Sequence, residues 1–372
     1  SFSMMLGVFL LGIMLGSLLV VTLSRSNLNL RTVLIFLQAG IGLYVIGSLY
    51  NIDQLLSAPW NGYNLQKPIF VFSRYFLDSS ALMLLPAIGL GMSFPILVKM
   101  ISSGCKHIGK ETGQIYGVNT LGAIAGSLLT GFLLIPKLGT QQSLLLVATL
   151  NLLMMLFLFR TGDYFTKTLR KVMTVVLAGV ILIVNVGVPP DLLDRFFMRD
   201  SAGQKDIRKL IYFEEGLTDT VAIFKDDYGI LDPDAKRLVT NGVSMSAVNF
   251  VASRYMKLLA HIPIILVDNP QNILVVCFGT GQTTGAAAMH PNVKSVDSVD
   301  LSESVLKAGN VFASQNYNAL KNDKVRTLLT DGRNHLLTTQ KMYDVITSEP
   351  PPPRTAFTVN LYTKEYYEMA RK

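Results

Sequence analysis

The sequence predicts a multi-span α-helical membrane domain followed by an α/β domain, with a small antiparallel β-sheet before the parallel sheet. Half of the 372 residues are apolar and only 16% are charged, and nearly all acidic residues lie from Asp191 onward. From Asn272 the pattern changes to alternating strands and helices. The expected boundaries are 1–189 for the membrane domain, 190–206 for a connector, 207–262 for the small sheet plus a helix, and 263–372 for the α/β domain.

The membrane domain is predicted from six apolar runs separated by polar breaks. Each approaches or reaches the roughly 20 residues that a bilayer-spanning helix requires. The runs are Phe2–Leu23, Val33–Tyr50, Phe76–Val98, Ile115–Leu134, Ser143–Phe159 and Val172–Val188. The lipid bilayer is therefore an expected partner of this half of the chain.

The net charge of +8 is explained by lysines and arginines in the short loops between these runs, where they set topology. No basic run with interleaved aromatics is present, so nucleic acid is not an expected partner. By the positive-inside rule, the loops that carry more Lys and Arg lie in the cytoplasm. With six spans, this places the α/β domain outside the cytoplasm. One miscounted helix would reverse that placement, so the side of the membrane on which the α/β domain lies stays open. Cys105, Cys277 and the four histidines lack metal-site spacing.

Two pairs of glycines have the spacing that lets membrane helices approach closely. Gly12 and Gly16 lie in the first run, and Gly122 and Gly126 lie in the fourth. We expect helix packing at both pairs, with a substrate pathway as the alternative for the second.

The connector begins at Pro189 and Pro190, which end the last apolar run. The stretches KLIYFEEG, TDTVAIFKDD and KRLVTNG then predict short antiparallel strands. A helix is expected over VASRYMKLLAHIP, ending at Pro263.

In the last part of the chain, ILVVCF, VKSVDSVDL, VRTLLTDG and YDVITSE predict parallel strands. The first ends in FGTGQTTG, where Gly279 and Gly281 permit a tight turn close to a ligand. Gly285 allows the next helix to pack closely.

Carboxylates follow the other strands. Asp300 ends the second strand, 19 residues after Gly281, where it can accept hydrogen bonds from ribose hydroxyls; Asp297 is its competitor. Asp331 ends the third strand beside Gly332, and Glu349 ends the fourth. Taken singly, each carboxylate is as well explained by helix capping. Together, at one edge of a parallel sheet, they favour a nucleoside-bearing ligand.

Four stretches, ILVVCFGTGQTTG, VDLSESVLKAG, DGRNHLLTTQKMYDVI and LYTKEYYEMA, resemble the spermidine synthases, which are polyamine aminopropyltransferases built on a methyltransferase-type Rossmann fold. The earlier GQIYGVNTLGAIAGSLLTGFLLIPKLG resembles the multi-span domain fused to such enzymes in bacterial membrane proteins. The resemblance implies an integral protein of the bacterial inner membrane, a further helix before Ser1 and a sheet that continues beyond Lys372.

The resemblance also implies roles for individual residues. Decarboxylated S-adenosylmethionine, or S-adenosylmethionine itself, would lie against Gly279, Gly281, Gln282, Asp300, Asp331 and Gly332. Glu349 would be the catalytic base or would stabilise the developing positive charge, and Tyr255 and Tyr362 would contact the acceptor. The small-molecule acceptor stays unidentified, and aminopropyl and methyl transfer both stay open.

This sequence also departs from the family pattern on the acceptor side. Met245 stands near a position where a glutamine is common, and Met256 and Lys257 replace a His-Glu pair. A proline run, Pro350–Pro353, follows Glu349. Because a polyamine dication needs carboxylates, we expect an acceptor other than a standard diamine. The alternative function is a non-catalytic structural or transport subunit of a membrane complex.

Overall fold

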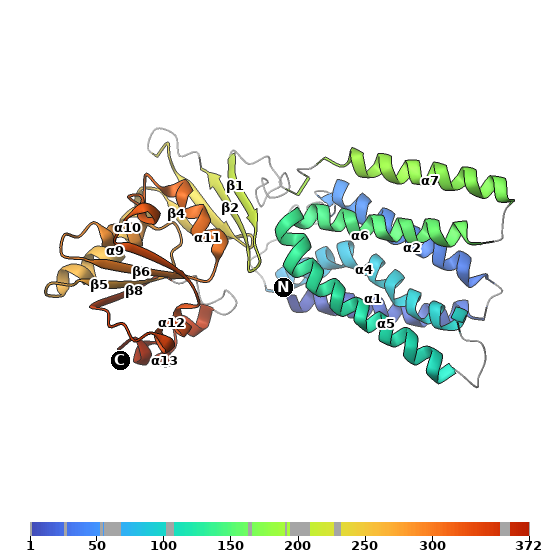
Figure 1. The fold of residues 1–372 in the computed structure, drawn as a ribbon, viewed down its shortest axis with the longest axis horizontal. Coiled ribbons are helices and arrows are strands. Elements are labelled where there is room, and N and C mark those ends of the chain that lie inside the picture. The colour runs from blue at the N-terminus through green and yellow to red at the C-terminus, as the bar shows by residue number, and fades with distance from the viewer. Residues whose placement is uncertain are drawn as a thin grey trace. The chain divides into compact units, whose positions relative to one another are not determined.

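A computed structural model of the protein describes residues 2–25, 28–52, 55, 68–101, 108–162, 166–189, 192–193, 209–226, 232–349 and 358–371. The chain divides into two compact units, Ser1–Lys205 and Asp206–Lys372, called here the helical unit and the α/β unit (Figure 1). The division falls within the connector expected over 190–206. Each unit has its own buried apolar clusters.

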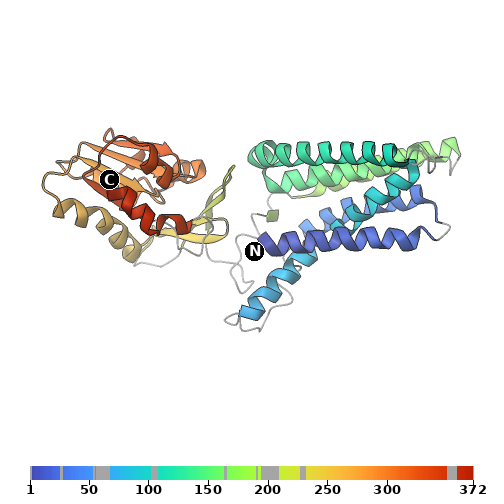
Figure 2. The ribbon, with the colours of Figure 1, turned by 90° about the horizontal axis from the view of Figure 1, so that it is seen from below.

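The helical unit consists, over its described residues, of long helices lying alongside one another (Figure 2). They are α1 (Phe2–Leu23), α2 (Leu30–Tyr50), α4 (Pro68–Ile101), α5 (Ile108–Leu129), the π-helix η2 (Thr130–Leu134), α6 (Ile135–Arg160) and α7 (Lys167–Gly187). Five described stretches are long and apolar enough to cross a membrane, and the longest, Gly109–Arg160, contains both α5 and α6. Each of the six expected runs therefore falls on a helix.

A glycine inside α6, close to the junction with α5 and η2, marks the kink in that helix. Gly139 has φ +80° and ψ 165°, a conformation that side-chain-bearing residues rarely adopt, and Figure 1 shows the chain turning back between α5 and α6.

The two glycine pairs differ in their surroundings. A Cβ on Gly12 would lie 2.5 Å from the Cβ of Ala87, and one on Gly16 would lie 2.1 Å from the Ile88 carbonyl oxygen. These glycines therefore allow α1 to approach α4, as expected. At Gly122 and Gly126 an added Cβ would meet nothing within 4 Å. The packing expected for this pair is wrong within the described chain.

The α/β unit begins with an antiparallel sheet in the order β1-β2-β3-β4. Its strands are β1 (Lys209–Glu215), β2 (Thr220–Lys225), β3 (Lys236–Thr240) and β4 (Val243–Val248). The fourth strand was not predicted. Its signal is Asn241-Gly242, whose φ values of +51° and +75° suit the two-residue hairpin turn that this dipeptide favours. Val221, Ile223 and Leu238 of this sheet share a core with Phe278 and Phe312.

Helix α9 (Phe250–Leu266) follows, capped by the Asn249 side chain, which accepts from Ala252 N at 2.8 Å. The predicted end at Pro263 is wrong, because the helix continues to Leu266. Proline has no N–H to bond the carbonyl four residues earlier. The Thr347 hydroxyl donates to that carbonyl, Leu259 O, at 2.9 Å and so satisfies the group that the proline leaves open.

The parallel sheet has the order β7-β6-β5-β8. Its strands are β5 (Asn272–Val276), β6 (Ser295–Asp300), β7 (Val325–Leu329) and β8 (Val345–Ser348), all parallel and all on predicted strands. Between and after them lie α10 (Gln282–Ala288), α11 (Glu303–Ala308), the 3-10 turns η4 (Gly309–Phe312), η5 (Ala319–Lys321) and η6 (Thr358–Leu361), α12 (Gly332–Thr338) and α13 (Lys364–Arg371).

The side chains of β5 alternate between two cores. Ile273 and Val275 pack with residues of α9 and α10, whereas Leu274 and Val276 pack with Leu336 of α12. These helices therefore cover opposite faces of a Rossmann-like sheet. Strand order reverses around β5, with β6 on one side and β8 on the other, and ligands of such sheets bind at the carboxyl ends of the strands at this point.

Candidate active site

The turn after β5 is built on positive φ angles. Cys277, Gly279 and Gly281 have φ values of +74°, +55° and +78°. A Cβ on Gly281 would lie 2.6 Å from the Phe278 ring, and one on Gly285 would lie 1.9 Å from Asn316 O. The tight turn is confirmed, but Gly285 accommodates the Asn316 backbone rather than the sheet.

Asn316 was missed by sequence reasoning, because it lies 35 residues after the turn that it fixes. It is 1% exposed, and its amide nitrogen donates to Thr280 O and Gly309 O, both at 3.0 Å. This side chain therefore holds the glycine turn in place.

Asp300 joins the ends of β5 and β6. Its Oδ2 accepts from Phe278 N at 2.8 Å, and its Oδ1 accepts from Ser302 N at 2.9 Å. Burial raises the pKa of Asp300, and these backbone donors oppose that shift. Because a carboxylate offers about four acceptor sites, both oxygens still have capacity for a ligand.

Asp331 and Gly332 form a second part of the site. Asp331 Oδ1 accepts from Asn334 N at 2.9 Å, so it caps α12. Helix capping is the alternative role that the sequence allowed for each carboxylate. It also lines the pocket described below. A Cβ on Gly332 would lie 2.4 Å from Val276 Cγ1, so only glycine fits between this helix and β5.

Glu349 follows β8, and its N–H donates to Val276 O at 3.2 Å. Burial raises the pKa of Glu349 to about 7. Burial raises the pKa of the Tyr255 and Tyr362 phenols, and the charge of Glu349 raises each of them further. The charge of Glu349 thus acts on both predicted acceptor residues, but neither tyrosine is among the described residues that line the pocket below.

Asp300, Asp331 and Glu349 line one cavity of about 370 Å³, within the usual size range of small-molecule sites. Four carboxylates line it: Asp219, Asp300, Asp331 and Glu349. Gly279, Gly332 and Met245 also line it, and no Lys or Arg is among the described lining residues. The cavity therefore favours a ligand that carries hydroxyls, amino groups or positive charge.

Asp219 was missed because it comes from the antiparallel sheet, in the β1–β2 hairpin. Its Oδ1 accepts from the Ser302 hydroxyl at 2.8 Å, and burial raises its pKa. Only the packing of the antiparallel sheet on α11 brings it to the pocket.

Two predicted cofactor residues lie outside the pocket lining. Gly281 shapes the turn, as described above. Gln282 is 1% exposed, and its amide nitrogen donates to Thr280 Oγ1 at 3.0 Å and Met256 Sδ at 3.1 Å. Lys257, one of the two residues that replace the His-Glu pair of the family, is also outside the described lining, with its ammonium 4.6 Å from the Tyr317 ring centre.

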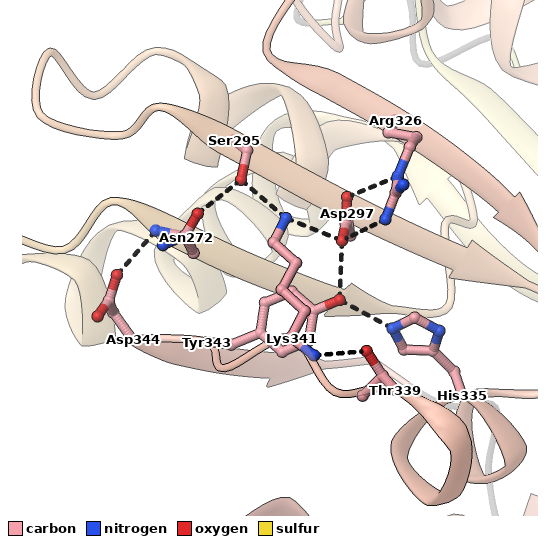
Figure 3. Close-up of polar contacts among 9 residues, drawn as sticks. All are labelled: Asn272, Ser295, Asp297, Arg326, His335, Thr339, Lys341, Tyr343 and Asp344. Carbon is pink, nitrogen blue, oxygen red and sulfur yellow. Dashed lines mark hydrogen bonds and ion pairs between the residues drawn. The ribbon is translucent and has the colours of Figure 1, made fainter.

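Asp297, the competitor of Asp300, belongs to a separate polar cluster (Figure 3). Its carboxylate accepts from Arg326 at 3.0 and 3.1 Å, from Lys341 at 3.0 Å and from Tyr343 at 2.8 Å. Burial would raise the pKa of Asp297, but these donors outweigh it and lower the pKa. We assign Asp297 a structural role.

Comparison with known proteins places the site in context. Residues 252–372 match the family described as spermine/spermidine synthase domain. The chain is 26% identical over 292 residues to a polyamine aminopropyltransferase of Oceanobacillus iheyensis, covering 76% of this chain and 53% of that protein. It is 35% identical over 114 residues to a polyamine aminopropyltransferase of Methanocaldococcus jannaschii, covering 31% of this chain and 39% of that protein.

A crystal structure of spermidine synthase in complex with the transition-state analogue AdoDATO aligns with a TM-score of 0.40 and 21% identity, covering 44% of this chain and 54% of that one. The chain spans about half the length, or less, of the curated relatives that it matches.

Proposed function

We propose that the protein is a membrane-bound aminopropyltransferase, because residues 252–372 match the family described as spermine/spermidine synthase domain. Its donor would be decarboxylated S-adenosylmethionine, and its acceptor an amine. The observation that carries the proposal is the pocket at the carboxyl edge of the parallel sheet, with four carboxylates and no described basic residue in its lining.

The donor set fits an adenosyl-sulfonium ligand. Asp300 has acceptor capacity for ribose hydroxyls, and Asp331 can accept from an adenine amino group. Both carboxylates also favour the positive charge of a sulfonium. When bound, the donor supplies a carbon activated by the adjacent sulfonium.

Glu349 would act on the acceptor. As the acceptor nitrogen bonds to the activated carbon, the carbon–sulfur bond breaks, its electron pair stays on sulfur, and the proton lost by the amine passes to Glu349. A base with a pKa near 7 is well matched to this transfer at neutral pH. Tyr255 and Tyr362 would position the amine beside it.

The charge of the pocket favours aminopropyl over methyl transfer. S-adenosylmethionine keeps a carboxylate that the decarboxylated donor lacks, and that group would enter a cavity already lined by four acids. Gln282 and Thr283, at the start of α10 after the glycine turn, are buried, and the Gln282 amide nitrogen donates to protein partners. Repulsion between the carboxylate of S-adenosylmethionine and the four acids, with no described Lys or Arg in the lining to offset it, disfavours S-adenosylmethionine as the donor.

Membrane attachment is supported by the helical unit. Its five candidate spans expose large apolar side chains outward, such as Phe36 and Val186, each more than 70% exposed. Side chains of this kind on long apolar helices are typical of a lipid-facing surface. Inside the unit, Thr149 donates to Asn185 Oδ1 at 2.8 Å, a polar contact between membrane helices.

Calorimetric titration of the detergent-purified chain tests the proposal. We expect micromolar binding of the decarboxylated donor and at least roughly tenfold weaker binding of S-adenosylmethionine, the effect of about 1.4 kcal/mol. Transfer to a panel of monoamines, diamines and aminated lipids would follow by mass spectrometry. If neither donor binds to folded protein, the transferase proposal fails and a non-catalytic membrane subunit becomes the better explanation.

A further inference from the structure

Helix α9 carries an apolar face that the described chain leaves uncovered. Met256, Ala260 and Ile264 are buried against the parallel sheet. The opposite face presents Val251, Tyr255, Leu258, Ile262, Ile265 and Leu266, each between 44% and 78% exposed. Their spacing of three and four residues makes one continuous stripe along the helix, and α9 lies on the outside of the α/β unit (Figure 2).

The charged residues within α9 are positive, although the Asp232 carboxylate accepts from Phe250 N at 2.7 Å at the start of the helix and exposed Asp268 follows its end. The sequence of α9, FVASRYMKLLAHIPIIL, contains Arg254 and Lys257 and no Asp or Glu. The Arg254 guanidinium lies 5.6 Å from the Phe250 ring centre, and the Lys257 ammonium lies 4.6 Å from the Tyr317 ring centre. Apolar residues flanked by aromatics and basic side chains are the composition of helices that lie in the surface of an anionic bilayer.

We propose that α9 is an interfacial helix that docks the α/β unit onto an anionic lipid surface. The inference rests on the membrane attachment in the proposed function. About twenty residues join the end of α7 at Gly187 to β1 at Lys209, a tether of at most roughly 75 Å, so a bilayer that holds the helical unit stays within reach of α9.

Docking would have a consequence for the active site. Tyr255 belongs to the stripe, and the hydroxyl of Thr347, two residues before Glu349, joins β8 to α9 by donating to Leu259 O. The Glu349 side of the pocket would therefore lie toward the lipid surface. An amine concentrated at an anionic bilayer would then reach Glu349 from that surface.

Brominated-lipid quenching of a single tryptophan tests the docking. The only native tryptophan is removed with Trp60→Phe, and Ile262→Trp places the probe in the stripe. Leu337→Trp is the matched control, because Leu337 is also exposed (60%) but lies on α12, which covers the other face of the sheet. The full chain is reconstituted in phosphatidylglycerol-containing vesicles, with unchanged thermal melting as the check of folding.

We expect brominated acyl chains to quench the Ile262→Trp emission roughly twofold while aqueous iodide does not, and the reverse for Leu337→Trp. Adding Arg254→Gln and Lys257→Gln should reduce the lipid quenching in anionic vesicles. The inference is overturned if iodide quenches both probes alike. It is also overturned if the Ile262→Trp probe is shielded from both quenchers, because a second copy or other protein then covers the face.

Two further readouts separate this inference from the proposed function. If the unmodified chain does not float with vesicles, membrane attachment itself is wrong, and α9 docking falls with it. If the chain floats and the probe is not quenched by lipid, only the docking is wrong. Donor titration reports on the active site independently of both.

Discussion

Replacing Glu349 by glutamine should stabilise the protein at alkaline pH while abolishing transfer. Glu349→Gln keeps the size and polarity of the side chain but removes the charge that burial penalises. Burial raises the pKa of Glu349 from 4.5 to about 7. Below pH 4.5 the carboxyl is protonated in both folded and unfolded chains. As pH rises from 4.5 to 7, only the folded state retains the proton, so the free energy of unfolding falls through this window and stays low above it.

The size of the effect follows from that shift. One pKa unit corresponds to about 1.4 kcal/mol, so the shift sets a ceiling of roughly 3 kcal/mol. Because Glu349 is only partly buried, we expect about 2 kcal/mol. In a unit of this size 1 kcal/mol moves Tm by about 2–4 °C, so the variant should melt about 4–8 °C higher than the wild type at pH 8 and at the same temperature near pH 4.5.

Thermal melting of the detergent-purified chain across this pH range is the assay, with Glu303→Gln as the control. Glu303 is exposed and ion-paired with Lys307 at 3.1 Å, so its replacement should leave the pH dependence unchanged. Wild-type transfer should rise with pH through about 7, and Glu349→Gln should bind the donor without transferring its group. Equal melting of wild type and variant at pH 8 would refute the buried-carboxyl reasoning.

Three further substitutions test single contacts. Asp331→Asn keeps a side-chain cap for α12 but removes the charge, so calorimetry should find donor affinity about tenfold lower with Tm nearly unchanged; unchanged affinity would contradict the assigned contact. Gly285→Ala should cost about 3 kcal/mol in thermal melting, since its Cβ would strike the Asn316 backbone; Gly113→Ala, where nothing lies within 4 Å of the added Cβ, is the control and should stabilise slightly, by up to about 1 kcal/mol, because it lies inside helix α5. Thr347→Val removes the hydroxyl that bonds an α9 carbonyl and should cost about 1 kcal/mol, whereas an unaltered Tm would show that water replaces the bond.

The carboxylates of the site could be predicted because each follows a strand. The strands of a parallel sheet end at one edge, so Asp300, Asp331 and Glu349 meet there whatever the intervening helices do. Asp219 follows no such rule, since it reaches the pocket through the packing of the antiparallel sheet on α11, and its contact with Ser302 spans 83 residues.

Rules about local sequence also explain the two wrong predictions of secondary structure, the end of α9 and the missing strand β4. Pro263 is a helix breaker by its own chemistry, yet α9 continues because Thr347 supplies a distant hydroxyl. Strand β4 was missed although the Asn241-Gly242 turn before it was visible in the sequence. Avoiding the first error would have required knowledge of the tertiary structure, whereas the second could have been avoided from the sequence alone.

Side chains alternate between the two faces of a β-strand, so Asp297 and Asp300, three residues apart on β6, point to opposite faces. Asp297 contacts Tyr343, which bonds His335 of α12, whereas Asp300 lies at the strand end and lines the pocket. Asp297 is 1% exposed, and its lowered pKa means that its stabilisation is present above pH 4 and is lost as pH falls through the folded-state pKa.

Asp297→Asn should therefore destabilise the chain at neutral pH. Loss of a buried partner costs about 3–5 kcal/mol when the remaining charge is also buried. Arg326 is 62% exposed and Lys341 32% exposed, so solvent compensates both and we expect about 2 kcal/mol. Donor affinity, measured by calorimetry on the folded variant, should stay within about twofold of the wild type, since none of these side chains lines the pocket. A tenfold loss of donor affinity in the folded variant would reverse the assignment and make Asp297 the ligand contact on β6.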